Sequence, residues 1–106
     1  MRAALLLPLA LALAACSGPL SESRSLFEKG HYAEAKQALA AIDRPGRRWT
    51  VAERARFTLY RGLTLGALGD RGRAAESLRE ARSLEVALDG DDTAMLEQAL
   101  DTYGVR

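Results

Sequence analysis

The sequence predicts an all-α fold, in which antiparallel helical hairpins are closed by a C-terminal capping helix. Two observations support this prediction. Alanine and leucine supply most of the apolar residues and β-branched residues are few, a composition that favours helix over strand. Across residues 55–88, apolar residues recur at steps of three and four, the period of a helix with one apolar face. At 106 residues the chain has room for one small domain.

The N-terminus has the layout of a secretory signal peptide. Arg2 precedes an apolar run of about 13 residues, which leads through small residues to Cys16. This run is too short for a transmembrane helix, which needs about 20 residues. Cys16 is the only cysteine, so no intramolecular disulfide can form. On these residues alone, an ordinary secreted protein with a cysteine after its cleavage site is the alternative interpretation.

The segment Leu13-Ala-Ala-Cys16 resembles the lipobox of bacterial lipoproteins. The resemblance implies that residues 1–15 are a lipoprotein signal peptide and that Cys16 carries diacylglycerol and an acylated α-amino group. Two or three acyl chains form a stable anchor, at about 0.8 kcal/mol per buried methylene. Ser17 rather than aspartate follows the cysteine, which implies the outer membrane by analogy with enterobacterial lipoproteins. We therefore expect a lipid-anchored protein that faces the periplasm, with residues 16–20 as its lipidated tether.

The mature chain begins with two predicted helices. The first runs from Leu20 or Ser21 to about Lys29, and after a turn at residues 30–31 the second runs from Tyr32 to Ile42. A loop over residues 43–49 follows, with a turn marked by its Pro-Gly pair.

The central hairpin begins at Thr50-Val-Ala-Glu53, the signature of a capping box. Trp49 precedes this cap and is expected to pack on Phe57. Two helices, residues 55–68 and 73–88, are joined by a turn with two glycines. Small residues are expected to let the two backbones approach closely: Gly62, Gly66, Ala74 and Ala81.

This hairpin resembles a tetratricopeptide repeat, a 34-residue helix–turn–helix unit with small and large residues at fixed offsets. The matching positions are Gly62, Leu65, Gly69, Ala74, Leu78 and Ala81. Thr58 replaces the family's tryptophan, and Val86 stands where its closing proline is expected. A truncated second copy lies upstream, with Gly30, Ala35 and Leu39 at the spacing of Gly69, Ala74 and Leu78. The resemblance implies about one and a half to two repeats over residues 21–88.

Residues 89–106 are expected to form the capping helix and the C-terminus. Asp91 or Asp92 is the predicted N-cap of a helix from Thr93 to about Tyr103, which Gly104 ends. Two hairpins and a cap are close to the minimum for a repeat stack, so a homodimer or a docked partner would help to complete the core.

The sequence contains no convincing catalytic constellation, and we expect neither an enzyme nor a bound cofactor or metal. His31 is the only histidine, and it stands in a turn where a solvated polar residue is the ordinary interpretation. The segment Asp89-Gly-Asp-Asp92 lacks the closing glutamate of a calcium loop. Without Arg2, 14 basic residues face 14 acidic ones, because the whole chain has 15 and 14. This balance argues against nucleic-acid binding, which needs a basic excess.

Two surfaces are candidate binding sites for a protein partner in the cell envelope. The repeat resemblance implies a concave face with Arg24, Phe27, Arg56, Leu59 and Leu63, suited to a helical or extended apolar peptide unless the leucines fill the core. The second surface is the loop with Arg44, Arg47, Arg48 and Trp49. This loop would contact anionic headgroups or an acidic partner, unless Trp49 packs into the core.

The expected function is that of an adaptor or scaffold in an envelope assembly for secretion, a pilus or outer-membrane biogenesis. The alternative is an accessory regulator of a cell-wall enzyme.

Overall fold

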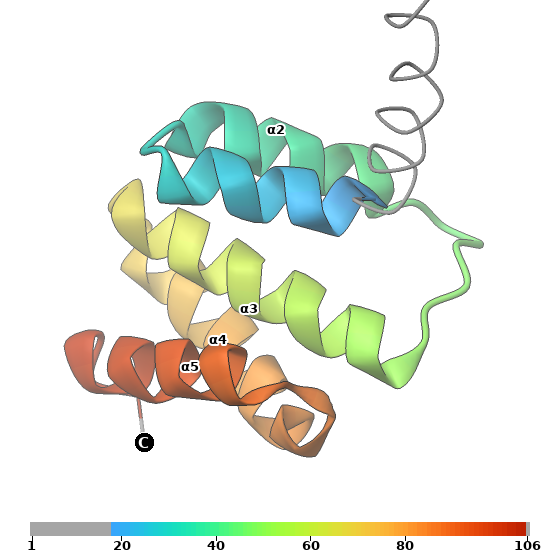
Figure 1. Cartoon of the computed structure of the whole chain (residues 1–106). Helices are drawn as coiled ribbons and strands as arrows, with labels where there is room; N and C mark the ends of the chain where they lie inside the picture. The colour runs from blue at the N-terminus through green and yellow to red at the C-terminus, as the bar shows by residue number, and fades with distance from the viewer. Residues whose placement is uncertain (1–17, 106) are drawn as a thin grey trace, which may run out of the picture.

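A computed structural model describes residues 18–105, and helices are the only regular elements over this range (Figure 1). Residues 18–28 are helical and are called the first helix here. It is followed by α2 (Tyr32–Ile42), α3 (Val51–Ala67), α4 (Arg71–Ser83), the short 3-10 helix η1 (Glu85–Ala87) and α5 (Gly90–Thr102). The prediction of an all-α fold is confirmed. Within residues 18–105, no helix is both long enough and apolar enough to cross a membrane.

The local signals in the sequence fix several helix ends. The bounds of α2 are those predicted. At the start of α3, the Glu53 backbone N–H donates to Thr50 Oγ1 at 3.0 Å, and the Thr50 N–H donates to Glu53 Oε1 at 2.9 Å. The predicted capping box is therefore present. At the end of α5, Gly104 has a φ of 64° and the Val105 N–H donates to the Leu100 carbonyl, so this glycine ends the helix as expected.

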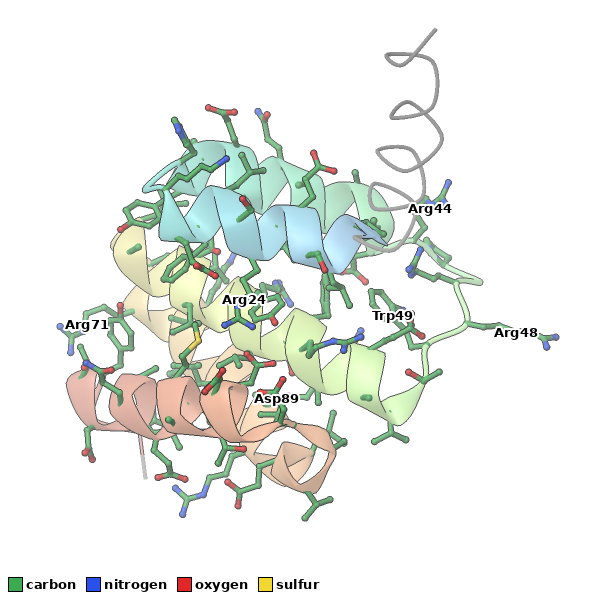
Figure 2. All side chains as sticks on the ribbon, in the orientation of Figure 1. Arg24, Arg44, Arg48, Trp49, Arg71 and Asp89 are labelled. Atoms are coloured by element: carbon green, nitrogen blue, oxygen red, sulfur yellow. The ribbon has the colours of Figure 1, made fainter. Side chains whose placement is uncertain are left out.

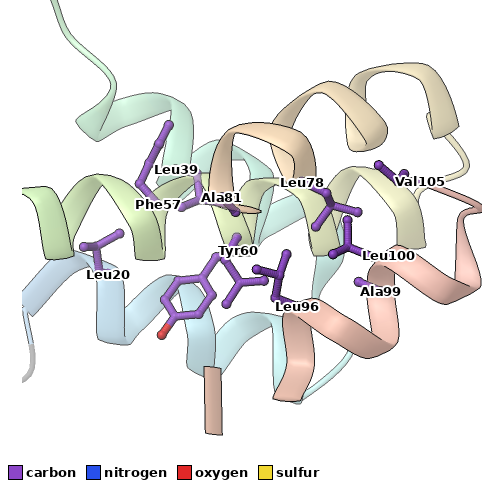
Figure 3. Packing of buried hydrophobic residues seen from close by; sticks show 11 residues of the cluster. Leu20, Leu39, Phe57, Tyr60, Leu78, Ala81, Leu96, Ala99, Leu100 and Val105 are labelled. Carbon is purple, nitrogen blue, oxygen red and sulfur yellow. The ribbon is translucent and has the colours of Figure 1, made fainter. Parts of the chain in front are cut away.

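The helices pack around α3. The first helix and α2 lie side by side on one side of α3, and α5 packs against α3 and α4 (Figure 1). Arg54 near the start of α3 pairs with Glu80 near the end of α4, which shows that the two helices are antiparallel. The buried cluster draws on the first helix and on α2 to α5 (Figure 3): Leu20, Leu39, Phe57, Leu59, Tyr60, Leu78, Ala81, Leu96, Ala99, Leu100 and Val105.

Two glycines of α3 serve different neighbours. A Cβ on Gly62 would lie 2.7 Å from Cγ and Cδ2 of Leu78, so this position does bring α3 close to α4. A Cβ on Gly66 would lie 2.3 Å from Cζ of Tyr103, just after α5. The expectation that Gly66 serves the α3–α4 contact is therefore wrong, and this glycine makes room for an aromatic ring instead.

Three predicted boundaries are wrong. The helix expected over 73–88 ends at Ser83, whose hydroxyl donates to the Glu80 carbonyl, and η1 follows with Val86 95% exposed. The N-cap of α5 is Asp89, which has an extended backbone and accepts from the Asp92 N–H at 2.8 Å. Residues 18–20 belong to the first helix rather than to a tether; Pro19 is tolerated there, because a first helical turn needs no N–H at that position.

Candidate functional site

The residues predicted to share a concave face lie in three separate environments. Leu59 is fully buried in the core, so its side chain is not available to a partner. Phe27 and Leu63 line an apolar groove. Arg24 and Arg56 line a charged cleft elsewhere on the molecule. The structure therefore separates the apolar part of the expected surface from its basic part.

The apolar groove, with a volume of about 250 Å³, lies between the first helix, α3 and the C-terminal half of α5. Its apolar surface comes from Phe27, Leu63, Met95, Ala99 and the ring of Tyr103, and it is bordered by the exposed Gln98 and Thr102. Gly66 admits the Tyr103 ring, over which the Arg71 guanidinium lies at 5.6 Å.

The charged cleft has a volume of about 470 Å³. It lies where the first helix, the residues before and within α3, and the start of α5 meet. Its wall combines three arginines with four carboxylates: Arg24, Arg47, Arg56, Glu28, Glu53, Asp89 and Asp92. The remaining wall includes Tyr60 and residues 18–21.

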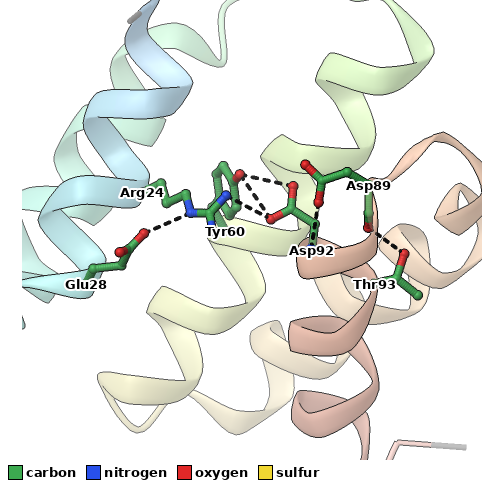
Figure 4. Close-up of polar contacts among 6 residues, drawn as sticks. All are labelled: Arg24, Glu28, Tyr60, Asp89, Asp92 and Thr93. Atoms are coloured by element: carbon green, nitrogen blue, oxygen red, sulfur yellow. Dashed lines mark hydrogen bonds and ion pairs between the residues drawn. The ribbon is translucent and has the colours of Figure 1, made fainter.

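A polar network joins several residues of the charged cleft (Figure 4). Arg24 Nη1 donates to Asp92 Oδ1 at 3.3 Å, and Arg24 Nε donates to Glu28 Oε1 at 2.8 Å. The Tyr60 hydroxyl lies 3.4 Å from Asp92 Oδ1 and 3.3 Å from Oδ2, and it donates to this carboxylate. The Asp92 side chain is only 1% exposed. The network therefore ties the first helix and α3 to the first turn of α5.

The electrostatics of this network follow from burial. Burial raises the pKa of Asp92 above its ordinary value, with a further contribution from the charge of Asp89, while Arg24 acts against the increase. Burial also raises the pKa of the Tyr60 phenol, and the nearby Asp92 carboxylate adds to this effect. At the cleft edge, the hydrogen bonds from Thr50 lower the pKa of Glu53.

The loop with Arg44, Arg47, Arg48 and Trp49 is divided between the interior and the solvent (Figure 2). Trp49 packs against Phe57 with ring centroids 4.9 Å apart, which confirms the predicted contact. Arg47 lies 4.6 Å from the indole centroid, so its guanidinium stacks on this ring. Arg44 and Arg48 are exposed. Trp49 is therefore held by the bundle, while Arg44 and Arg48 remain on the exposed surface of the loop.

The described residues offer no obvious centre for metal chemistry. Between residues 18 and 105, no three histidine, cysteine, aspartate or glutamate side chains gather where they could hold an ion. His31 precedes α2, and its Nδ1 lies 3.4 Å from Glu34 Oε1 with the imidazole 52% exposed. Cys16 and Ser17 lie outside the described residues.

Sequence reasoning missed Tyr60, Asp89 and Asp92 of the cleft and Met95 and Tyr103 of the groove. A signal existed for the groove, because Met95, Ala99 and Tyr103 recur at steps of four on the last helix. None existed for the pairing of Arg24 with Asp92, because these residues are separated by 68 positions.

Comparison with known proteins adds no family to this picture. No family model matches the sequence, and neither a curated protein nor a solved structure matches it.

Proposed function

We propose that this chain is a lipid-anchored envelope protein whose helical bundle, similar to a tetratricopeptide-repeat unit, acts as a non-catalytic adaptor. Its anchor is Cys16, and the apolar groove binds a segment of a partner protein. The antiparallel packing of α3 on α4 and the close approach at Gly62 support the repeat-like arrangement. The lipobox-like Leu13-Ala-Ala-Cys16 supports the anchor, and Ser17 rather than aspartate after the cysteine supports a location at the periplasmic face of the outer membrane.

The groove is the observation on which the adaptor role depends. At about 250 Å³ it is smaller than ordinary small-molecule sites, which occupy roughly 300–1,000 Å³. A few apolar side chains of a peptide would fill it, and the amides and hydroxyls at its edge could bind the peptide backbone. Recognition of an apolar helix face by such a groove is a recurrent mode of peptide binding.

Site-specific photo-crosslinking in intact cells tests this role. A photoreactive residue replaces Gln98 at the groove, or Gln37 on α2 as the control. Both glutamines are exposed and helical, so neither replacement should disturb the fold. We expect defined envelope-protein adducts from position 98 and none of them from position 37. The same adducts from both positions, or none from position 98, would contradict the proposal.

A charge in the groove provides the complementary test. Leu63→Glu should abolish the adducts from position 98, whereas Val86→Glu, at an exposed position on η1, should leave them unchanged. Thermal unfolding of both variants checks that the fold survives. If the adducts persist in a folded Leu63→Glu protein, the partner does not use the groove. Adducts with assembly components would indicate an adaptor, and adducts with a hydrolase or synthase would indicate the regulatory alternative.

A further inference from the structure

The charged cleft contains two arginines without a carboxylate of the described chain at ion-pair distance, although both act on Glu53 through space. Arg24 is paired with Glu28 and Asp92. Arg47 and Arg56, in contrast, form no ion pair within residues 18–105, and the Nε of each is buried without a hydrogen-bond acceptor. A charged N–H without an acceptor costs free energy. Because each Nε is covered, an anion that enters the cleft would bind the terminal Nη groups of the two arginines, which line it. A guanidinium suits phosphate and carboxylate because its N–H groups form a planar fork.

The carboxylates of the cleft, unlike the Nε atoms of Arg47 and Arg56, all have hydrogen-bond partners within residues 18–105. Glu28 accepts from Arg24, Glu53 from the Thr50 N–H, and Asp92 from Arg24 and Tyr60. Asp89 accepts from the Asp92 N–H as the N-cap of α5, but it is exposed and has no cationic partner in the described part of the chain. Its charge acts on Asp92, whose pKa it raises. The exposed Asp89 therefore attracts a cation, whereas Arg47 and Arg56 attract an anion.

We propose that this cleft binds a zwitterionic phosphate ester of the phosphoethanolamine type, with the phosphate on Arg47 and Arg56 and the ammonium group on Asp89. A zwitterion fits better than a simple anion, because four carboxylates and three arginines line the same wall. The choice of phosphate over carboxylate rests on the proposed membrane anchor. Gly18 lines the cleft two residues after Cys16, and two residues span at most about 7 Å. An anchored protein would hold the cleft within reach of lipid headgroups.

Trp49 makes this binding measurable, because it is the only tryptophan and carries the stacked Arg47 guanidinium. The full chain, extracted from membranes in an uncharged detergent, is titrated with phosphoethanolamine, glycerophosphoethanolamine, inorganic phosphate and glycine. Indole fluorescence and thermal stabilisation are the two readouts. We expect both ethanolamine phosphates to bind more tightly than inorganic phosphate or glycine.

Matched variants locate the ligand in the cleft. Arg56→Ala should weaken binding of both ethanolamine phosphates by about tenfold or more, since a hydrogen-bonded ion pair is lost. Arg56→Lys should restore part of the affinity, and Arg79→Ala, at an exposed arginine of α4, should have no effect. Asp89→Asn keeps a good N-cap and should remove the preference for phosphoethanolamine over inorganic phosphate.

The two esters distinguish the source of the ligand. Tighter binding of glycerophosphoethanolamine, a diester like the headgroup, supports a membrane phospholipid, and tighter binding of the monoester overturns that source in favour of a soluble ester. No response to either ester, tighter binding of glycine, or binding that persists in a folded Arg56→Ala protein overturns the proposal. The choice of phosphate rests on the proposed anchor, but these titrations measure the cleft with soluble probes, whereas the crosslinks measure the groove. This inference and the proposed adaptor role can therefore fail separately.

Discussion

At the scale of single residues, Gly62 shows how the absence of one methyl group sets the distance between two helices. A Cβ there would meet Leu78, a side chain with no exposed surface and therefore little freedom to move. The cost of crowding a packed core is about 1–3 kcal/mol, which exceeds the roughly 1 kcal/mol that a helix gains when glycine becomes alanine.

We therefore expect Gly62→Ala to lower the free energy of unfolding and Gly72→Ala to raise it by about 0.5 kcal/mol. Gly72 lies in α4, is exposed, and has no heavy atom within 4 Å of the position its Cβ would take. Urea unfolding of the two variants checks the opposite signs. If Gly62→Ala were as stable as Gly72→Ala, the close packing of α3 on α4 would be disproved.

Asp92 should make the folded state more stable at low pH, which is the opposite of the usual effect of a carboxylate. Its pKa in the folded state is raised above the ordinary value of 3.8, mainly by burial, so the folded state binds the proton more tightly than the unfolded state. The resulting stabilisation is complete below the unfolded pKa and is lost as the pH rises through the folded pKa. Relative to Asp92→Asn, the wild type should therefore gain stability as the pH falls from about 7 to about 4.5.

Urea unfolding at both pH values measures this difference. Asp91→Asn is the control, because it removes an exposed carboxylate from the neighbouring position. A difference between wild type and Asp92→Asn that stays constant with pH, or that changes in the opposite direction, would contradict the assigned environment of Asp92.

At the scale of elements, the signals that succeeded were local ones. The capping box of α3 is contained in four consecutive residues, and the bounds of α2 follow from a short apolar period between two turns. The prediction that failed at the start of α5 concerns a site where two residues could serve the same role. Asp89 and Asp92 are equally good caps in isolation, and Asp92 is excluded because the bundle uses its carboxylate as the acceptor for Arg24 and Tyr60. The apolar pattern from 84 to 88 likewise could not show that the chain leaves α4 before Leu84.

The capping box predicts the stability of α3. Thr50→Ala removes the hydroxyl that accepts from the Glu53 N–H, and we expect the free energy of unfolding to fall by about 1 kcal/mol. Thr50→Ser keeps an equivalent oxygen and should lose little of this stability. Chemical denaturation compares the two, and equal losses from alanine and serine would show that the cap contributes nothing.

At the scale of the whole molecule, the sequence was sufficient to predict the fold class. It was not sufficient to predict which residues form the groove and the cleft. Helical periodicity predicted which faces are apolar, yet it could not separate Leu59 in the core from Leu63 in the groove, four positions later on the same helix. The cleft could not be predicted, because it is assembled from the first helix, the residues before and within α3 and the start of α5. Long-range pairs such as Arg24 and Asp92 leave no local pattern.

The proposed anchor concerns the whole molecule and can be tested by cell fractionation. Cys16→Ser should remove lipidation, so that the protein is found in the periplasm or remains as unprocessed precursor. As a control, the Ser17→Asp variant keeps the cysteine, and this protein should still sediment with membranes. Intact mass measures the processing. A Cys16→Ser protein with unchanged membrane retention and unchanged processed mass would disprove the lipoprotein proposal.

The antiparallel packing of α3 on α4 also has a kinetic consequence. These helices are joined by the short turn between Ala67 and Arg71, so their contacts form at a small cost in loop-closure entropy. The hydrogen bond between Arg24 and Asp92 closes a loop of 68 residues and can be made only once both ends of the bundle have come together. Folding should therefore begin in the α3–α4 pair and end with the docking of the first helix on α5. The cleft, which needs all of these parts, is then the last feature to appear and the first to be lost.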